Sequence, residues 1–143
     1  MRKNLIVNLF VVFVCFILSG CGANESINNA VGVTMTIKEG TLTKTGATVV
    51  ITDVSGKKNV YGEEYRIDKL QNGKWKELEV IVEGNYGWNL IGYYVGEDNT
   101  LELEHNWEWL YGELEIGEYR LVKNTSESGD STNHYFSVQF TID

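Results

Sequence analysis

The sequence predicts an all-β protein, an antiparallel sandwich of about seven strands. Apolar and polar residues alternate along several short segments, as they do on strands with one buried face. Asn72-Gly73 stands between two of these segments and has the composition of a two-residue hairpin turn. Later in the chain, Gly117-Glu118-Tyr119 precedes Leu121 and has the form of a tyrosine corner. No segment shows a helical period, which favours the all-β class.

Residues 1–20 have the organisation of an export signal. A short basic region precedes an apolar run from Leu9 to Leu18 that is too short for a lasting transmembrane helix. The run ends in Leu18-Ser19-Gly20-Cys21, which resembles the lipobox of bacterial lipoproteins. That resemblance implies cleavage before Cys21 and a lipid on its sulfur, which would hold the protein at the extracytoplasmic face of the cell membrane. The alternative is an ordinary secretory signal in which the cysteine occurs by chance.

Removal of the signal leaves 123 of the 143 residues, enough for one domain with its own core. It takes away Arg2 and Lys3 and no acidic residue, so the formal net charge falls from −8 to −10. A surface of this sign disfavours nucleic acid and gives no attraction to anionic lipid, so the lipid on Cys21 would be the membrane anchor. Cys15 is lost with the signal and Cys21 carries the lipid, so we expect no disulfide.

Residues 21–32 are small and polar and are expected to form a flexible tether between lipid and domain. The domain itself is predicted to span residues 33–143. It begins with two strands, because apolar residues occupy every second position in Val33–Ile37 and again in Ala47–Ile51.

Asn72-Gly73 predicts a type I′ hairpin, because both central positions of that turn need a positive φ, which Asn and Gly tolerate best. A two-residue turn fixes the register of the two strands and places Leu70 opposite Trp75. Such an aromatic–aliphatic pair contributes about 0.2–1 kcal/mol. Trp75 is equally compatible with a half-exposed contact surface.

Further strands are predicted at Leu90–Val95, at Thr100–Tyr111, from Tyr119 onward, and at Phe136–Ile142. The second of these alternates strictly, so Trp107 and Trp109 share its apolar face and both are expected in the core. A polar loop, Asn124–Asn133, is expected before the last strand.

The stretch Trp107–Lys123 reads WEWLYGELEIGEYRLVK and resembles the bacterial immunoglobulin-like domains found on many cell-surface lipoproteins. The likeness extends over Val33–Asp143 and departs from the pattern in Gly84–Gly96. It implies an immunoglobulin-like β-sandwich with no known catalytic residues and no disulfide, in which Gly117 and Tyr119 have a structural role.

No arrangement of residues predicts catalysis. Glu102, Glu104 and Glu108 are expected on the opposite strand face from His105, so they form a solvated row and not an acid–base pair with it. His105 and His134 are expected to be core histidines bonded to the backbone. A metal shared by the two is the alternative, for which the sequence supplies no third or fourth ligand. We therefore expect neither a metal nor a cofactor.

Tyr86, Trp88, Tyr93 and Tyr94 lie among four glycines and are the candidate binding residues. Exposed Trp and Tyr rings stack on sugars or anchor protein partners, whereas a core role is the alternative. The sequence thus predicts a membrane-anchored, non-catalytic binding or interaction module, whose partner is an unidentified envelope protein or glycan. A carbohydrate-binding or carbohydrate-active envelope protein is the alternative function, and a structural spacer is a third.

Overall fold

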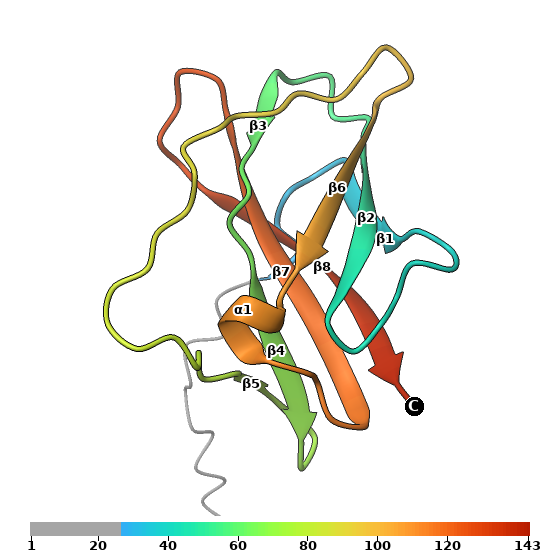
Figure 1. Ribbon diagram of the computed structural model, residues 1–143. Helices are drawn as coiled ribbons and strands as arrows, with labels where there is room; N and C mark the ends of the chain where they lie inside the picture. Colours follow the sequence, from blue (N-terminus) through green and yellow to red (C-terminus); the bar gives the residue numbers. More distant parts are fainter. Residues whose placement is uncertain (1–26) are drawn as a thin grey trace, which may run out of the picture.

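The structure is a computed structural model that describes residues 27–143. The predicted signal, Cys21 and the first part of the predicted tether lie outside the described residues. Within residues 27–143, eight strands form two antiparallel sheets that pack face to face (Figure 1). This confirms the all-β, immunoglobulin-like sandwich that the sequence predicts.

Each sheet has a simple strand order. The smaller sheet runs in the order β1 (Val33–Ile37), β2 (Gly46–Asp53) and β6 (Thr100–Asn106). The larger sheet contains β3 (Asn59–Tyr61), β7 (Gly117–Glu127), β4 (Arg66–Gln71), β5 (Lys74–Glu77) and β8 (His134–Ile142).

Strand β7 is the centre of the larger sheet, because it pairs with β8 on one edge and with both β3 and β4 on the other. It continues to Glu127, so the predicted loop from Asn124 begins too early. The polar composition of this end of β7 is typical of a loop. Thr125 is nevertheless buried, and its hydroxyl donates to the carbonyl of Val60 at 2.7 Å. A polar residue with a satisfied hydrogen bond can occupy an inward position of a strand.

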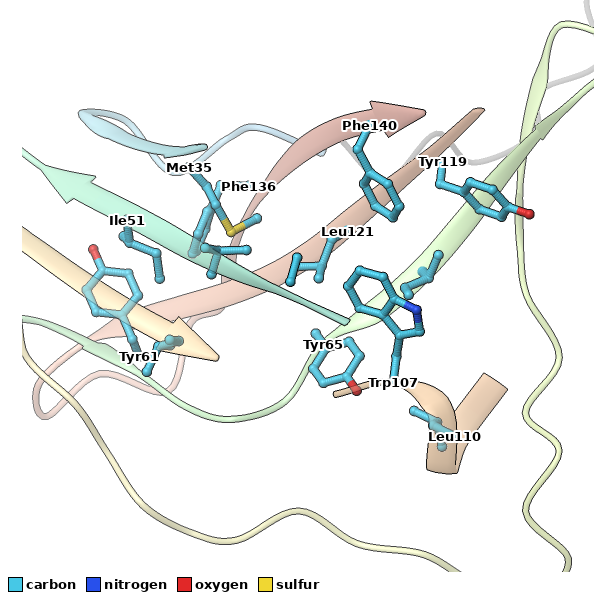
Figure 2. Close-up of a cluster of buried hydrophobic side chains, with 14 of the residues drawn as sticks. Met35, Ile51, Tyr61, Tyr65, Trp107, Leu110, Tyr119, Leu121, Phe136 and Phe140 are labelled. Atoms are coloured by element: carbon cyan, nitrogen blue, oxygen red, sulfur yellow. The ribbon is translucent and has the colours of Figure 1, made fainter. Parts of the chain in front are cut away.

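The core lies between the sheets and is filled by the alternating apolar residues (Figure 2). Val49, Ile51, Ile67, Leu121 and Trp107 are completely buried. Burial of each such side chain contributes about 1.5–3 kcal/mol, and no disulfide is needed to hold the sheets together. The predicted core position of Trp107 is confirmed.

The hairpin at Asn72-Gly73 is confirmed. Both residues have positive φ, 51° and 74°, and they connect β4 to β5 in the predicted register, with Leu70 opposite Trp75. The guanidinium of Arg120 lies 4.8 Å from the centroid of the Trp75 ring, which is half-buried. Trp75 therefore packs within the sheet surface and is not a free contact residue.

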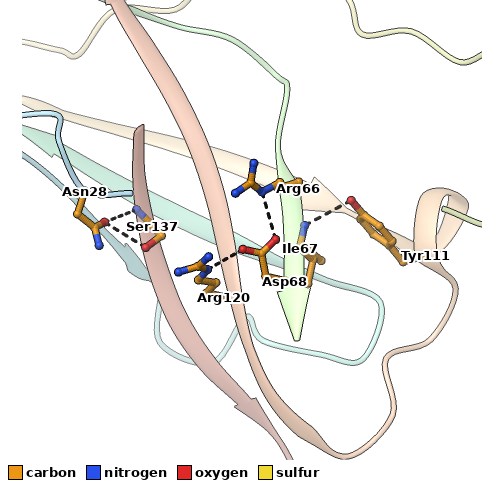
Figure 3. A network of polar contacts seen from close by, with 7 residues as sticks. All are labelled: Asn28, Arg66, Ile67, Asp68, Tyr111, Arg120 and Ser137. Carbon is orange, nitrogen blue, oxygen red and sulfur yellow. Dashed lines mark hydrogen bonds and ion pairs between the residues drawn. The ribbon is translucent and has the colours of Figure 1, made fainter. Parts of the chain in front are cut away.

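The same sheet surface carries a buried carboxylate. Asp68 is 2% exposed, and its two oxygens accept hydrogen bonds from Arg66 Nε at 3.1 Å and Arg120 Nε at 2.6 Å (Figure 3). Charged partners on both sides compensate the cost of removing the carboxylate from water.

The long strand predicted at Thr100–Tyr111 is wrong in its second half. β6 ends at Asn106, whose side-chain oxygen accepts from the Glu108 amide at 3.0 Å, and the short helix α1 (Glu108–Tyr111) follows. An Asn side chain that bonds the backbone two residues later turns the chain away from the sheet. Trp109 consequently leaves the apolar face of Trp107 and is 44% exposed.

Two other expectations are corrected. Leu90–Val95 forms no strand in the described chain, because its backbone pairs with β3 only through an isolated bridge between Tyr93 and Tyr61. The end of the predicted tether is docked, since the side chain of Asn28 accepts from Ser137, and the Ala30 amide donates to the carbonyl of Tyr135. The domain therefore begins before residue 33.

Candidate functional site

The connection between β5 and β6, residues 78–99, runs along one side of the sandwich (Figure 1). Backbone hydrogen bonds hold it on both sides of Tyr86 and Trp88. The Ile81 amide donates to the carbonyl of Leu110 in α1 at 2.8 Å, and Tyr93 exchanges two bonds with Tyr61 of β3. The segment between these points is thereby placed beside α1.

Tyr86 and Trp88 from this connection meet Trp109 from α1. The Trp88 and Trp109 ring centroids are 5.5 Å apart at an interplanar angle of 75°, and Tyr86 approaches both rings edge to face. Such edge-to-face contacts are the favoured geometry of aromatic rings and hold this cluster in shape. Tyr86 and Trp109 are each 44% exposed, whereas Trp88 is half-buried.

Trp88 is also the link between this cluster and the core. Its ring lies 4.9 Å from that of Tyr65, which is buried, and Tyr65 in turn lies 4.6 Å from the imidazole of His105. The Tyr65 hydroxyl donates to the carbonyl of Asn106 at 3.1 Å, at the point where β6 ends. The cluster therefore rests on a fixed base.

Beside the cluster lies a groove of about 520 Å³. Its aromatic wall is made by Tyr65, Trp88, Trp109 and Tyr93, and its remaining polar lining includes Glu63, Asn89, Glu102, Glu104, His105 and Asn106. Within residues 27–143, no Lys or Arg side chain lines the groove. It is therefore an aromatic and acidic surface, large enough for a small organic group.

Neutral donors hold Glu63 in place. Its carboxylate accepts from the Tyr93 hydroxyl at 3.0 Å and from the Asn89 amide at 2.9 Å. The bond to Glu63 is also the main reason why the pKa of Tyr93 is raised, so the phenol stays protonated. On the other side of the groove, Lys38 pairs with Glu102 at 2.9 Å.

His105 lies at the inner wall and is 5% exposed. Burial, with a smaller contribution from the charge of Lys123, lowers the pKa of His105 to about 3, so the imidazole is neutral at pH 7. Its Nε2 has no hydrogen-bond partner among the described residues. The inward position predicted for His105 is confirmed, but the backbone bond expected for it is not made by Nε2.

A lysine is buried behind this wall. Lys123 is 1% exposed, and its Nζ donates to the carbonyls of Gly62 and Glu64, both at 2.9 Å. Burial lowers the pKa of Lys123 to about 7, although Glu64 and Glu63 act in the opposite direction. The ammonium fastens the irregular connection between β3 and β4, where Glu63 and Tyr65 are located.

A model of the family described as Bacterial Ig-like domain matches residues 29–141. The chain belongs to the bacterial Ig-like domain family. The match covers most of the chain and confirms the resemblance predicted from Trp107–Lys123. A search of curated proteins and a search of solved structures each returned no match. Domains of this family are typically non-catalytic interaction modules.

The Ig-like domain brings together three of the four candidate binding residues. Tyr86 and Trp88 belong to the aromatic cluster, and Tyr93 lines the groove beside it. Tyr94 points elsewhere: it is 48% exposed and lies under the ammonium of Lys58, 5.1 Å from the ring centroid. Trp109 completes the cluster. The alternating sequence pattern did not predict its exposure, because the helical turn that exposes it is only four residues long.

The tyrosine corner of the Ig-like domain lies at the start of β7, four residues before Lys123. The Tyr119 hydroxyl donates to the carbonyl of Glu115 at 2.7 Å. A Cβ added at Gly117 would come within 3.2 Å of the Lys69 side chain and 3.5 Å of the Tyr119 ring. Glycine at this position therefore leaves room for both side chains.

The two histidines of the Ig-like domain do not form one site. His105 lines the groove, whereas His134 lines a separate cavity of about 90 Å³ beside Lys57 and Asp130. Among residues 27–143, no group of three or more His, Cys, Asp and Glu side chains is placed to hold a metal ion. That part of the chain also contains no helix with the length and apolarity that a bilayer crossing needs.

Proposed function

We propose that this protein is a membrane-anchored extracytoplasmic lipoprotein, and that its Ig-like domain acts as a non-catalytic binding module. The proposed anchor is the lipid on Cys21, which follows the lipobox-like Leu18-Ser19-Gly20. The proposed partner is a component of the cell envelope, a protein or a glycan.

The observation that carries the binding role is the exposed ring of Trp109 beside the groove. A Trp that is 44% exposed next to a second, half-buried Trp is unusual for a side chain with no other task, because exposure of large aromatic surface to water is unfavourable. Partially exposed Trp and Tyr side chains are the residues that most often dominate binding energy at interfaces.

Trp109 is the better residue for a test than Trp88. Trp88 packs on the buried Tyr65, so its removal would disturb the core as well as the groove. The ring contacts of Trp109 among residues 27–143 are with Tyr86 and Trp88, and the side chain is 44% exposed, so its truncation is expected to disturb the core less than that of Trp88.

The test is capture of partners from the native envelope by chemical crosslinking of the full-length protein. Trp109→Ala is expected to reduce the yield of the captured partner, because it removes the most exposed tryptophan of the aromatic wall of the groove. Tyr94→Ala is the matched control, since Tyr94 is similarly exposed and does not line the groove. Equal capture by the parent and both variants would contradict the proposed site.

A further inference from the structure

The groove beside Trp88 and Trp109 has a chemistry that indicates its ligand. We propose that the groove binds an organic cation, an ammonium or guanidinium group. This proposal rests on the binding function proposed above. The group would be a basic side chain of an envelope protein or a free organic amine of that chemistry. It would sit between the two tryptophan rings and the carboxylates of Glu63 and Glu104.

The first argument is charge. Glu63, Glu102 and Glu104 line the groove, and no Lys or Arg of residues 27–143 does. Glu63 accepts hydrogen bonds from two neutral donors, so it is oriented without being neutralised. Glu104 makes no ion pair within the described part of the chain, and Lys38 pairs with Glu102 alone. The groove thus keeps unpaired negative charge, which favours a cationic group over a neutral or anionic one.

Neither of the two bases close to the groove puts a positive charge at its lining, although the buried ammonium of Lys123 acts on Glu63 from behind. His105 is neutral at pH 7, and its unpartnered Nε2 brings no positive charge to the inner wall. The ammonium of Lys123 is 1% exposed and is bonded to two backbone carbonyls, so it does not reach the lining. A cation in the groove would therefore meet no competing cation of this chain at the lining.

The second argument is the arrangement of the rings. Trp88 and Trp109 meet at 75°, and Tyr65 is inclined to Trp88 by 56°, so the wall of the groove presents rings at steep angles to one another. Trp109 is 44% exposed, so its ring offers free surface beside the carboxylates of the groove, and an aromatic face next to negative charge is a favourable position for an organic ammonium group. A sugar ring stacks best on one flat aromatic face, and neighbouring rings at steep angles leave little such area.

The third argument is rigidity. Tyr93 is fixed to β3 by two backbone bonds, its hydroxyl holds Glu63, and Trp88 rests on Tyr65. The carboxylate and the rings are therefore placed before any ligand arrives. A preformed site loses little conformational entropy on binding, which raises the affinity that a small cation can reach.

The test uses the full chain purified in detergent and labelled with ¹⁵N, and follows the indole N–H signals of its four tryptophans. The probes are tetramethylammonium and N-acetyl-argininamide. Either cation is expected to shift the signals of Trp88 and Trp109 in a saturable way. Trp75 and Trp107 do not line the groove and serve as internal controls, so their signals are expected to stay in place.

Neutral probes provide the contrast. N-acetyl-citrullinamide has the shape of the arginine probe without its charge, and maltotriose represents a neutral glycan. Both are expected to leave Trp88 and Trp109 unchanged at the concentrations where the cations bind. The cation affinity should also fall as salt is raised from low to physiological ionic strength, because the carboxylates are partly solvated.

Two variants assign the binding to the groove. Glu104→Gln and Trp109→Ala are each expected to weaken binding of N-acetyl-argininamide by about two- to fivefold, as expected for a partly exposed charge pair or cation–π contact. Glu118→Gln changes the same charge at an exposed position outside the groove and should have no effect.

Each outcome separates the ligand class from the binding function. Equal shifts with the citrulline probe or with maltotriose would overturn the cationic ligand and leave the groove as a binding site for neutral groups. Absence of shifts with every probe would overturn the cation proposal, while crosslinked capture that depends on Trp109 would still support the binding module. Tighter binding of an arginine-containing peptide than of tetramethylammonium would identify a basic protein side chain as the source of the cation.

Discussion

The Tyr119 hydroxyl donates a hydrogen bond to the main-chain carbonyl of Glu115, four residues earlier, at 2.7 Å. The Tyr119 ring is 2% exposed and stacks on Phe140 of β8, with centroids 5.7 Å apart. This single side chain therefore fastens the turn before β7 to the core and to the neighbouring strand.

Substitution Tyr119→Phe should lower the free energy of unfolding by about 1–2 kcal/mol, because it leaves the Glu115 carbonyl without its donor and keeps the ring packing. The measurement is the urea midpoint, with the far-ultraviolet circular dichroism spectrum as the check that the fold is unchanged. A midpoint equal to that of the parent would show that the hydroxyl contributes nothing to stability.

Substitution Asp68→Ala should lower the free energy of unfolding by about 1.5–3 kcal/mol, since Arg66 and Arg120 lose a buried carboxylate that both contact. Lys57→Ala is the control. Its ion pair with Glu127 is long, 3.5 Å, and exposed, so its loss should cost less than about 1 kcal/mol. Equal effects of the two substitutions in thermal or urea unfolding would contradict the role given to Asp68.

Two buried bases give stability a pH dependence of one sign. The pKa of His105 is lowered by burial from 6.5 to about 3, and that of Lys123 from 10.5 to about 7. Between the lowered pKa of each group and its ordinary pKa, the unfolded chain binds a proton that the folded chain does not. The free energy of unfolding therefore rises with pH in both ranges. The His105 contribution rises between about pH 3 and 6.5, and the Lys123 contribution between about pH 7 and 10.5.

The Lys123 window is tested by urea unfolding between pH 7 and 9.5. The free energy of unfolding of the parent should increase with pH, by at most about 1.4 kcal/mol per pH unit for one group. Lys123→Met removes the titrating amine next to Glu63, Glu64 and His105, and its stability should be nearly constant over this range. A parent with a flat profile would mean that the ammonium keeps an ordinary pKa despite its burial.

The anchor is tested by Cys21→Ala followed by fractionation of the cells. The substituted protein should accumulate uncleaved or leave the membrane fraction, because the lipid acceptor is gone. Ser19→Ala keeps a small residue before the cysteine and should be processed like the parent. Normal processing and membrane retention of the Cys21→Ala protein would rule out a lipid on Cys21 as the anchor.

The sequence predicted most of the fold because its strands carry local signals. Alternation in Val33–Ile37 places side chains on two faces, and Asn72-Gly73 supplies the positive φ of its turn, so neither depends on distant contacts. The prediction was wrong where the backbone is redirected by one side chain, as Asn106 does before α1. Alternation could not reveal that Trp109 lies on a helical turn.

The sequence by itself determined that the chain is all-β, that it belongs with immunoglobulin-like domains, and that aromatic residues at 86–93 deserve testing for binding. Only the tertiary structure decided what surrounds them. Trp109 and Trp88 are 21 residues apart in the chain, and a hydrogen bond between Ile81 and Leu110 joins the two segments that carry them. The buried Lys123 is likewise placed by its pairing with carbonyls 59 and 61 residues away. Local patterns follow from the geometry of one strand, whereas a groove arises where segments distant in sequence meet, and no short-range pattern records that meeting.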